Sequence, residues 1–298
     1  MKPTETQSQL AVLDNITVDR RNFMRKAGML GIGAAASGVV LAGRPAAAAT
    51  AAPQVNSYQA QDTTAEIFTA FLIAEDLATT FYYNGLVGSV IQSPALAGAG
   101  GSAAHPSSSG NAGNVDYLRA ALSQEISHAD LFRLGIGSSS PAADPYQTFY
   151  FPNGTFNTLP AFLGILNALE NAFIGAYLNM IQEFSYKAAL ARAGQLSGAD
   201  RRFTADDYEY FTKVAASILG VEAEHRVLGR VIGNENPANN LAYEQLDGIT
   251  SIYNGPNSAV AALTPFLTPS TGPGYSLATA LANQSSVSLP ASGNPPAE

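Results

Sequence analysis

The sequence contains no cysteine, and this absence removes several kinds of chemistry. There can be no disulfide framework, no thiolate site for zinc or an iron–sulfur cluster, no cysteine nucleophile and no lipidated cysteine. Charged residues make up only 13% of the chain, and its net charge is −8. This acidic balance argues against nucleic acid as a partner, because that binding depends on Lys and Arg neutralising phosphates. Histidine is scarce, and His105, His128 and His225 are the only imidazoles.

Apolar residues at helical spacing dominate the rest of the chain, and 46% of its 298 residues are hydrophobic. Such a composition supports a substantial core and excludes a wholly disordered protein. Four long helices are predicted over residues 63–90, 115–134, 159–193 and 204–232. Asp62 or Thr63 can cap the first helix, and Thr204 with the acids that follow it can start the fourth. Long alternating β-branched runs are absent, so we expect an all-α fold in which a sheet has little support.

The predicted helices define one bundle over residues 60–233, with appendages on both sides. Residues 135–158 contain three prolines and several aromatics, which is typical of a long crossover between the second and third helices. The region 234–298 is rich in Asn, Pro, Gly and Ser. We expect it to be a partly ordered C-terminal extension, with an apolar patch at 259–267, a short helix at 275–283 and a disordered end.

The first 50 residues have the character of an export signal. They hold six Lys or Arg against three acids, followed by an uncharged stretch at 27–43 and a small-residue run at 46–52. The core Arg20-Arg21-x-Phe23-Met24 resembles a twin-arginine (Tat) signal. That resemblance implies recognition by the Tat machinery and a folded, often cofactor-loaded protein delivered to the periplasm or the outside. The alternative is an uncleaved N-terminal membrane anchor, but five glycines in the 17 residues of 27–43 make a poor span.

Two of the three histidines follow a glutamate by three residues, as Glu125 with His128 and Glu222 with His225. Residues three apart on a helix share one face, so each pair can direct a carboxylate and an imidazole to one point. Glu170 is the only charged residue between positions 161 and 182. A carboxylate buried in such an apolar helix needs a proton, a cation or a metal. Glu75 has a similar setting in the first helix, although its neighbour Asp76 is an alternative buried acid.

The spacing of these residues indicates an internal duplication of a helix hairpin. Glu75 and Glu170 are 95 residues apart, and Glu125 and Glu222 are 97 apart. Tyr82 and Tyr177 each follow their glutamate by seven residues, which is two turns along the same face. Two similar hairpins related by a pseudo-twofold axis would bring four glutamates and two histidines together.

The pattern Glu, Glu-x-x-His, Glu, Glu-x-x-His over four helices resembles the ferritin-like di-iron carboxylate superfamily. The sequence also resembles the Tat-exported bacterial members of this superfamily, which are related to plant desiccation-related ferritin-like proteins. The resemblance covers about residues 63–232 and implies a ferritin-like four-helix bundle with two iron ions or, alternatively, manganese. It implies that Glu125 and Glu222 bridge the metals, that His128 and His225 each bind one, and that Glu75 and Glu170 are terminal ligands. Zinc is also compatible with these ligands, and Tyr82 and Tyr177 are candidates for hydrogen bonds to them.

Several other polar residues compete for roles in this interpretation. Glu224 is an alternative to Glu222 as the inward acid, but we expect it to be solvated or paired with a charge. His105, in a Gly/Ser-rich loop, and Arg201-Arg202, before the fourth helix, are expected to be solvated. No nucleotide-binding glycine loop or nucleophile elbow is present in the sequence.

The sequence leaves more than one function open. The metal centre predicts oxidation of ferrous ion, or reduction of dioxygen or peroxide, in stress defence. One alternative is a non-catalytic envelope or desiccation protein whose site is structural or empty, and another is an enzyme similar to manganese catalase. Whether the chain is an enzyme, and whether it forms a homo-oligomer, stays open at this point.

Overall fold

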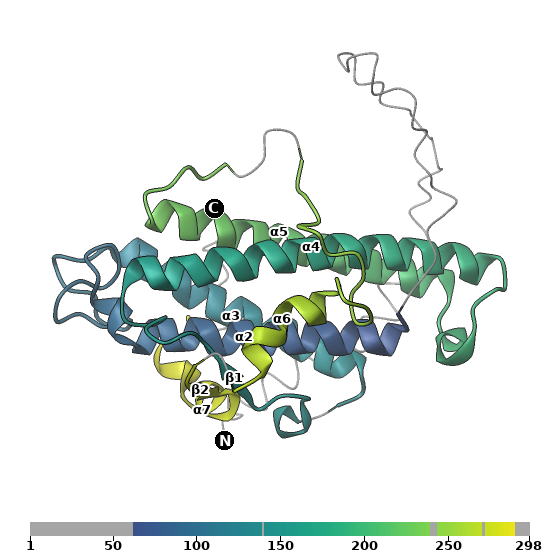
Figure 1. Cartoon of the computed structure of the whole chain (residues 1–298), viewed down its shortest axis with the longest axis horizontal. Coiled ribbons are helices and arrows are strands. Elements are labelled where there is room, and N and C mark those ends of the chain that lie inside the picture. Colours follow the sequence, from purple (N-terminus) through teal and green to yellow (C-terminus); the bar gives the residue numbers. More distant parts are fainter. Residues whose placement is uncertain (1–61, 139, 239–242, 270–271, 290–298) are drawn as a thin grey trace, which may run out of the picture. The chain divides into compact units, whose positions relative to one another are not determined.

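The computed structural model describes residues 62–138, 140–238, 243–269 and 272–289. The predicted export signal at 1–50 lies outside these residues. Four long helices form the bundle (Figure 1): α2 Thr64–Val87, α3 Ala112–Gly135, α4 Leu159–Arg192 and α5 Ala205–Ile232. α2 packs mainly against α3 and α4 packs mainly against α5, so the fold consists of two helix hairpins. This confirms the prediction of an all-α bundle.

The starts of the helices follow from local capping chemistry. Thr63 caps α2 in a capping box with Glu66, and Thr204 caps α5 in a capping box with Asp207. Asp62, the other candidate cap of α2, has a different role. Its carboxylate accepts hydrogen bonds of 2.9–3.0 Å from the backbone N–H groups of residues 252–254, which attaches the C-terminal region to the start of the bundle.

The connection between α2 and α3 is compact and is held by hydrogen bonds between its own backbone groups. It begins with the 3-10 helix η2 Ser89–Gln92, and it buries Leu96 and Ala97. The carbonyl groups of Leu96 and Ala97 accept hydrogen bonds from the backbone of Asn111 and Ser107. A Cβ atom on Gly101 would lie 2.2 Å from the Ala97 carbonyl oxygen, so glycine is required there.

The crossover between α3 and α4 and the C-terminal extension form a small ribbon that the sequence did not predict. The crossover contains the 3-10 helix η3 Pro141–Ala143 and the strand β1 Thr148–Tyr150. β1 pairs antiparallel with β2 Gly274–Ser276. Strands of three residues are too short to show a period of two, which explains why the sequence pattern gave no signal for them.

The C-terminal extension carries two short helices. α6 Ala259–Leu267 coincides with the predicted apolar patch and lies against α2 and α4. α7 Leu277–Asn283, followed by η5 Gln284–Ser286, begins two residues later than the predicted helix at 275–283. The difference arises because Tyr275 and Ser276 pair with β1, and the Ser276 side chain then caps α7.

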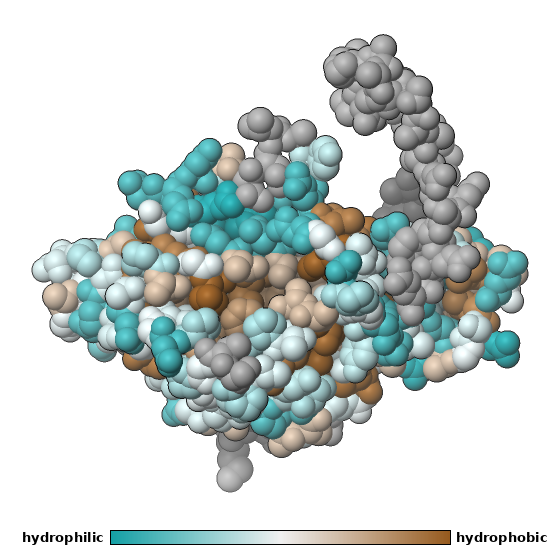
Figure 2. Space-filling model, in the orientation of Figure 1, coloured by the Kyte–Doolittle hydropathy of each residue, from teal (hydrophilic) through white to brown (hydrophobic). Residues whose placement is uncertain are grey.

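α4 is the one described helix that is long and apolar enough to cross a membrane by length and composition. Within the bundle, 56% of its most apolar 18-residue stretch is buried. Between residues 161 and 170, the exposed positions of α4 are Ala161, Gly164 and Ala168. On the face drawn in Figure 2, apolar residues form separate patches among polar ones. These observations fit a core helix of the bundle.

Two clusters of buried apolar side chains fill the bundle. On α3 the first cluster ends at Leu122 and the second begins at Ala129. On α4 the clusters divide between Phe173 and Ala176. Buried polar side chains lie near the boundary between these two apolar clusters and form a polar layer.

Candidate metal centre

The polar layer consists of the six side chains that the sequence predicts as metal ligands. Each hairpin contributes one glutamate from its first helix, and a glutamate with a histidine three residues later from its second helix. The six are Glu75 on α2, Glu125 and His128 on α3, Glu170 on α4, and Glu222 and His225 on α5. Five of them are no more than 2% exposed, whereas the His128 side chain is 12% exposed.

These residues form two overlapping groups. The candidate ligand atoms within each group all lie within 4.8 Å of one another. The His128 half-site consists of Glu75, Glu125, His128 and Glu222. The His225 half-site consists of Glu125, Glu170, Glu222 and His225.

Glu125 and Glu222 belong to both half-sites because each directs one oxygen to each histidine. Glu125 Oε1 lies 3.0 Å from His225 Nδ1, and its Oε2 lies 3.5 Å from His128 Nδ1. Glu222 Oε1 lies 3.3 Å from His128 Nδ1, and its Oε2 lies 3.4 Å from His225 Nδ1. This is the arrangement in which a carboxylate can bridge two ions.

Glu75 and Glu170 each serve a single half-site. Glu75 Oε2 lies 3.3 Å from His128 Nδ1, and Glu170 Oε1 lies 3.9 Å from His225 Nδ1. Tyr177 donates a hydrogen bond to Glu75 Oε1, and Tyr82 donates one of 2.6 Å to Glu170 Oε1. Each tyrosine belongs to the opposite hairpin, so these hydrogen bonds join the two hairpins. Burial and the nearby carboxylates raise the pKa of both tyrosines well above the ordinary value, which keeps them protonated as donors.

The electrostatics of the layer favour bound cations. Burial raises the pKa of Glu75 and Glu170 well above the ordinary value, and the neighbouring carboxylates add to this effect. Burial opposes the charged form of both histidines, but the surrounding carboxylates outweigh it and raise the pKa of His128 and His225. Burial likewise opposes ionisation of Glu125, yet the pKa of that carboxyl falls below its ordinary value because His225 lies beside it.

The donor atoms that face inward are those a divalent metal would use. Six carboxylate oxygens of the four glutamates and the Nδ1 atoms of both histidines are buried without a hydrogen-bond partner among the described residues. Leaving so many polar atoms unsatisfied is costly. Two divalent cations would balance the charge of four carboxylates and take the place of the protons that the layer otherwise holds. Oxygen and imidazole ligands suit iron and manganese, so the residues fit a dinuclear centre of either metal.

The competing acids lie elsewhere. Asp76 is buried but faces Arg133, whose Nη2 lies 3.0 Å from Asp76 Oδ1. Glu224 is exposed and accepts a hydrogen bond of 2.7 Å from Tyr117. His105 is exposed in the connection between α2 and α3.

The arginine pair also lies at the surface. Arg201 and Arg202 end the 3-10 helix η4 Gly198–Arg202 and are exposed. Arg202 stacks over the ring of Phe203, with 4.6 Å between its Cζ and the ring centroid. They take no part in the polar layer.

Gln124 is a residue of this site that the sequence did not reveal. Its Oε1 lies 2.9 Å from His225 Nε2, so it contacts the side of the imidazole that faces away from the carboxylates. Gln124 immediately precedes Glu125 on α3, while His225 is on α5. Only the register between these two helices places them together, and one sequence does not contain that information.

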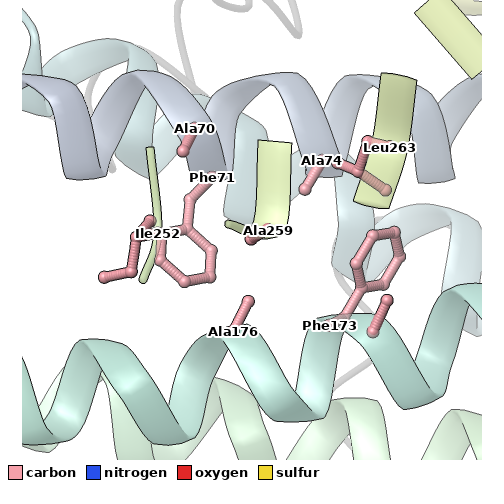
Figure 3. Close-up of a pocket in the computed structure, with 9 residues that line it drawn as sticks. Ala70, Phe71, Ala74, Phe173, Ala176, Ile252, Ala259 and Leu263 are labelled. Carbon is pink, nitrogen blue, oxygen red and sulfur yellow. The ribbon is translucent and has the colours of Figure 1, made fainter. Parts of the chain in front are cut away.

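A small apolar pocket lies beside this layer, between α2, α4 and α6 (Figure 3). Figure 3 shows Phe71 from α2 and Phe173 from α4 at its edges, with Leu263 from α6. Its lining contains no titratable side chain. The pocket is therefore a packing gap beneath the C-terminal extension, and the chemistry belongs to the polar layer.

Comparison with known families agrees with this architecture. Residues 63–205 match the family model of the ferritin-like domain. The match spans α2, α3 and α4 and stops at the first residue of α5, so it does not cover Glu222 and His225. No curated protein and no solved structure gave a significant match to the chain.

Proposed function

We propose that this ferritin-like chain binds two iron ions in the polar layer and oxidises ferrous iron, using dioxygen or peroxide, as a protective activity under stress. The observation that carries the proposal is the placement of Glu125 and Glu222, each of which directs one oxygen to each histidine. Such shared carboxylates are useful for holding two ions side by side and have little purpose for a single ion. Manganese is the alternative metal.

When bound, two ferrous ions would supply two electrons, enough to reduce dioxygen to hydrogen peroxide or hydrogen peroxide to water, with two protons consumed in either case. The chain provides the surroundings for this chemistry. The carboxylates would hold both ions within this buried layer, and Tyr82 and Tyr177 donate hydrogen bonds that fix the terminal carboxylates of Glu170 and Glu75. The two apolar clusters exclude bulk water, and the partly exposed edge of His128 offers the small oxidant a way in.

Stopped-flow oxidation tests this activity directly. We expect metal-free protein loaded with two ferrous ions per chain under anaerobic conditions to form ferric iron much faster than free ferrous ion at the same pH. The absorbance of ferric iron would be followed after mixing with dioxygen or with peroxide. A faster reaction with peroxide would assign a peroxidase-type role. Oxidation no faster than that of free iron with either oxidant would contradict the redox function and favour a structural site.

We also propose that the protein is exported through the Tat pathway to the periplasm or beyond. The support is the sequence alone: Arg20-Arg21-x-Phe23-Met24, the uncharged stretch at 27–43 and the small-residue run at 46–52. In cells with a Tat pathway, we expect Arg20→Lys combined with Arg21→Lys to retain the protein in the cytoplasmic fraction. Recovery of the unchanged chain in the membrane fraction with its N-terminus intact would instead indicate an anchor.

A further inference from the structure

The two half-sites match each other closely except on the outer side of their histidines. Each has a terminal glutamate held by a tyrosine from the other hairpin, and both share the bridging carboxylates. The two imidazoles differ in the surroundings of the ring edge that faces away from the carboxylates. The His225 side chain is 0% exposed, whereas that of His128 is 12% exposed.

The hydrogen bond that His225 donates to Gln124 is part of this difference. Gln124 Oε1 is an acceptor 2.9 Å from His225 Nε2, so Nε2 carries the proton and donates it. In the neutral, metal-binding form of His225 the lone pair is then on Nδ1, the atom that faces Glu125 and Glu222. Gln124 therefore holds this imidazole in the tautomer and orientation that a metal requires.

The internal duplication places a different residue at the corresponding position of the other half. Gln124 precedes Glu125, and the residue that precedes Glu222 is Val221. Valine has no hydrogen-bonding group to offer. Within the described part of the chain, no side chain or backbone group makes a hydrogen bond to His128 Nε2, so no partner on that side of the ring sets the tautomer or orientation of His128.

We infer that Gln124 is a positioning residue that makes the half-sites unequal: the His225 half-site binds a divalent transition-metal ion first and more tightly, and the His128 half-site binds the second ion more weakly and exchanges it with solvent. This inference rests on the proposed dinuclear centre. Loss of a hydrogen bond behind a histidine ligand typically lowers metal affinity by about 10–100-fold. An ion at the more exposed half-site also has the shorter path to water.

Manganese titration of the full chain, followed by calorimetry and by electron paramagnetic resonance, tests the assignment. Because the two ions share carboxylates, stepwise binding would arise even in a symmetrical site, so the test depends on variants. In Gln124→Val, each half-site has valine at this position, and we expect the first binding step to weaken by about 10–100-fold. In Val221→Gln each has glutamine, and we expect the second step to strengthen. His128→Ala should retain one tightly bound ion, and His225→Ala should lose it.

Two controls separate positioning from a general effect on folding. Gln124→Glu keeps an acceptor oxygen beside His225 and should restore the first step. Urea unfolding of the metal-free variants should match that of the original chain. If Gln124→Val folds normally and leaves the first step unchanged, the inference is overturned while the dinuclear centre stands. If no variant and not even the original chain binds manganese or ferrous ion, both are overturned.

Discussion

Replacing Glu222 with glutamine is expected to abolish binding of both metal ions. Glu222 directs one oxygen to each half-site, so the substitution removes a charged ligand from both ions at once. Glu75→Gln or Glu170→Gln removes a ligand from one half-site only and should leave about one ion per chain. Equilibrium dialysis against ferrous or manganous ion under anaerobic conditions, at concentrations that saturate the original chain, measures the stoichiometry.

Glu224→Gln is the matched control for this experiment. Glu224 is on the same helix, two residues further on, and is exposed beside Tyr117. Its substitution removes the same charge but no ligand, so metal content should be unchanged. If Glu222→Gln binds two ions with unchanged affinity, the proposal that Glu222 bridges the two metal ions is wrong.

Arg133→Met is expected to cause the largest loss of folding stability, about 3–5 kcal/mol. Arg133 is 4% exposed, and its guanidinium lies 3.0 Å from Asp76 and 2.7 Å from Asp144, which are also buried. Methionine fills much of the space of the arginine stem but leaves two buried carboxylates without their cation. Urea unfolding of metal-free protein, compared with the original chain at the same pH, measures the loss.

The stability loss should depend on pH in a defined direction. Burial and the neighbouring Asp144 raise the pKa of Asp76 to about 8, even with Arg133 present to lower it. The folded state therefore binds a proton that an unfolded aspartate, with a pKa near ~3.9, releases. Stability from this group falls as pH rises between these values. Without Arg133 the pKa of Asp76 rises further, so in the variant the fall continues to higher pH. The variant's deficit should therefore be greatest above pH 8 and smaller at lower pH.

Two further variants test whether the burial of the Arg133 ion pairs causes the loss of stability in Arg133→Met. Asp130→Asn removes a partner of Arg133 that is 47% exposed, and we expect a loss of no more than about 1 kcal/mol. Combining Arg133→Met with Asp76→Asn and Asp144→Asn removes the uncompensated charges and should recover most of the stability. An Arg133→Met protein within 1 kcal/mol of the original chain at pH 8 would contradict this account.

The bundle was predictable because its signals are local. Apolar residues at helical spacing identified all four helices, and Thr63 and Thr204 showed where two of them start. The ribbon of β1 and β2 gave no such signal, since its strands have three residues each and pair across more than a hundred residues. The role of Asp62 was hidden for the same reason, because its partners are at 252–254.

The candidate ligands could be predicted from the sequence where they lie on the same face of one helix or stand alone in an apolar helix. Glu125 with His128 and Glu222 with His225 are three apart, and Glu170 was conspicuous as the one charge in an apolar stretch. Glu75 and Asp76 could not be separated by sequence, because both are acids in the same apolar setting. Arg133 decides between them by pairing with Asp76, and that contact crosses from α3 to α2. The role of Gln124 could not be predicted from the sequence, because its contact with His225 depends on the register of α3 against α5.

The most direct test of the dinuclear centre is the metal content of the full chain purified from cells supplied with iron and manganese, measured by mass spectrometry of the elements. The four carboxylates and two histidines of the polar layer predict about two transition-metal ions per chain, iron or manganese, and a fall to about one ion per chain in Glu170→Ala. Less than one metal ion per chain, with Glu170→Ala leaving both metal content and thermal stability unchanged, would contradict the account.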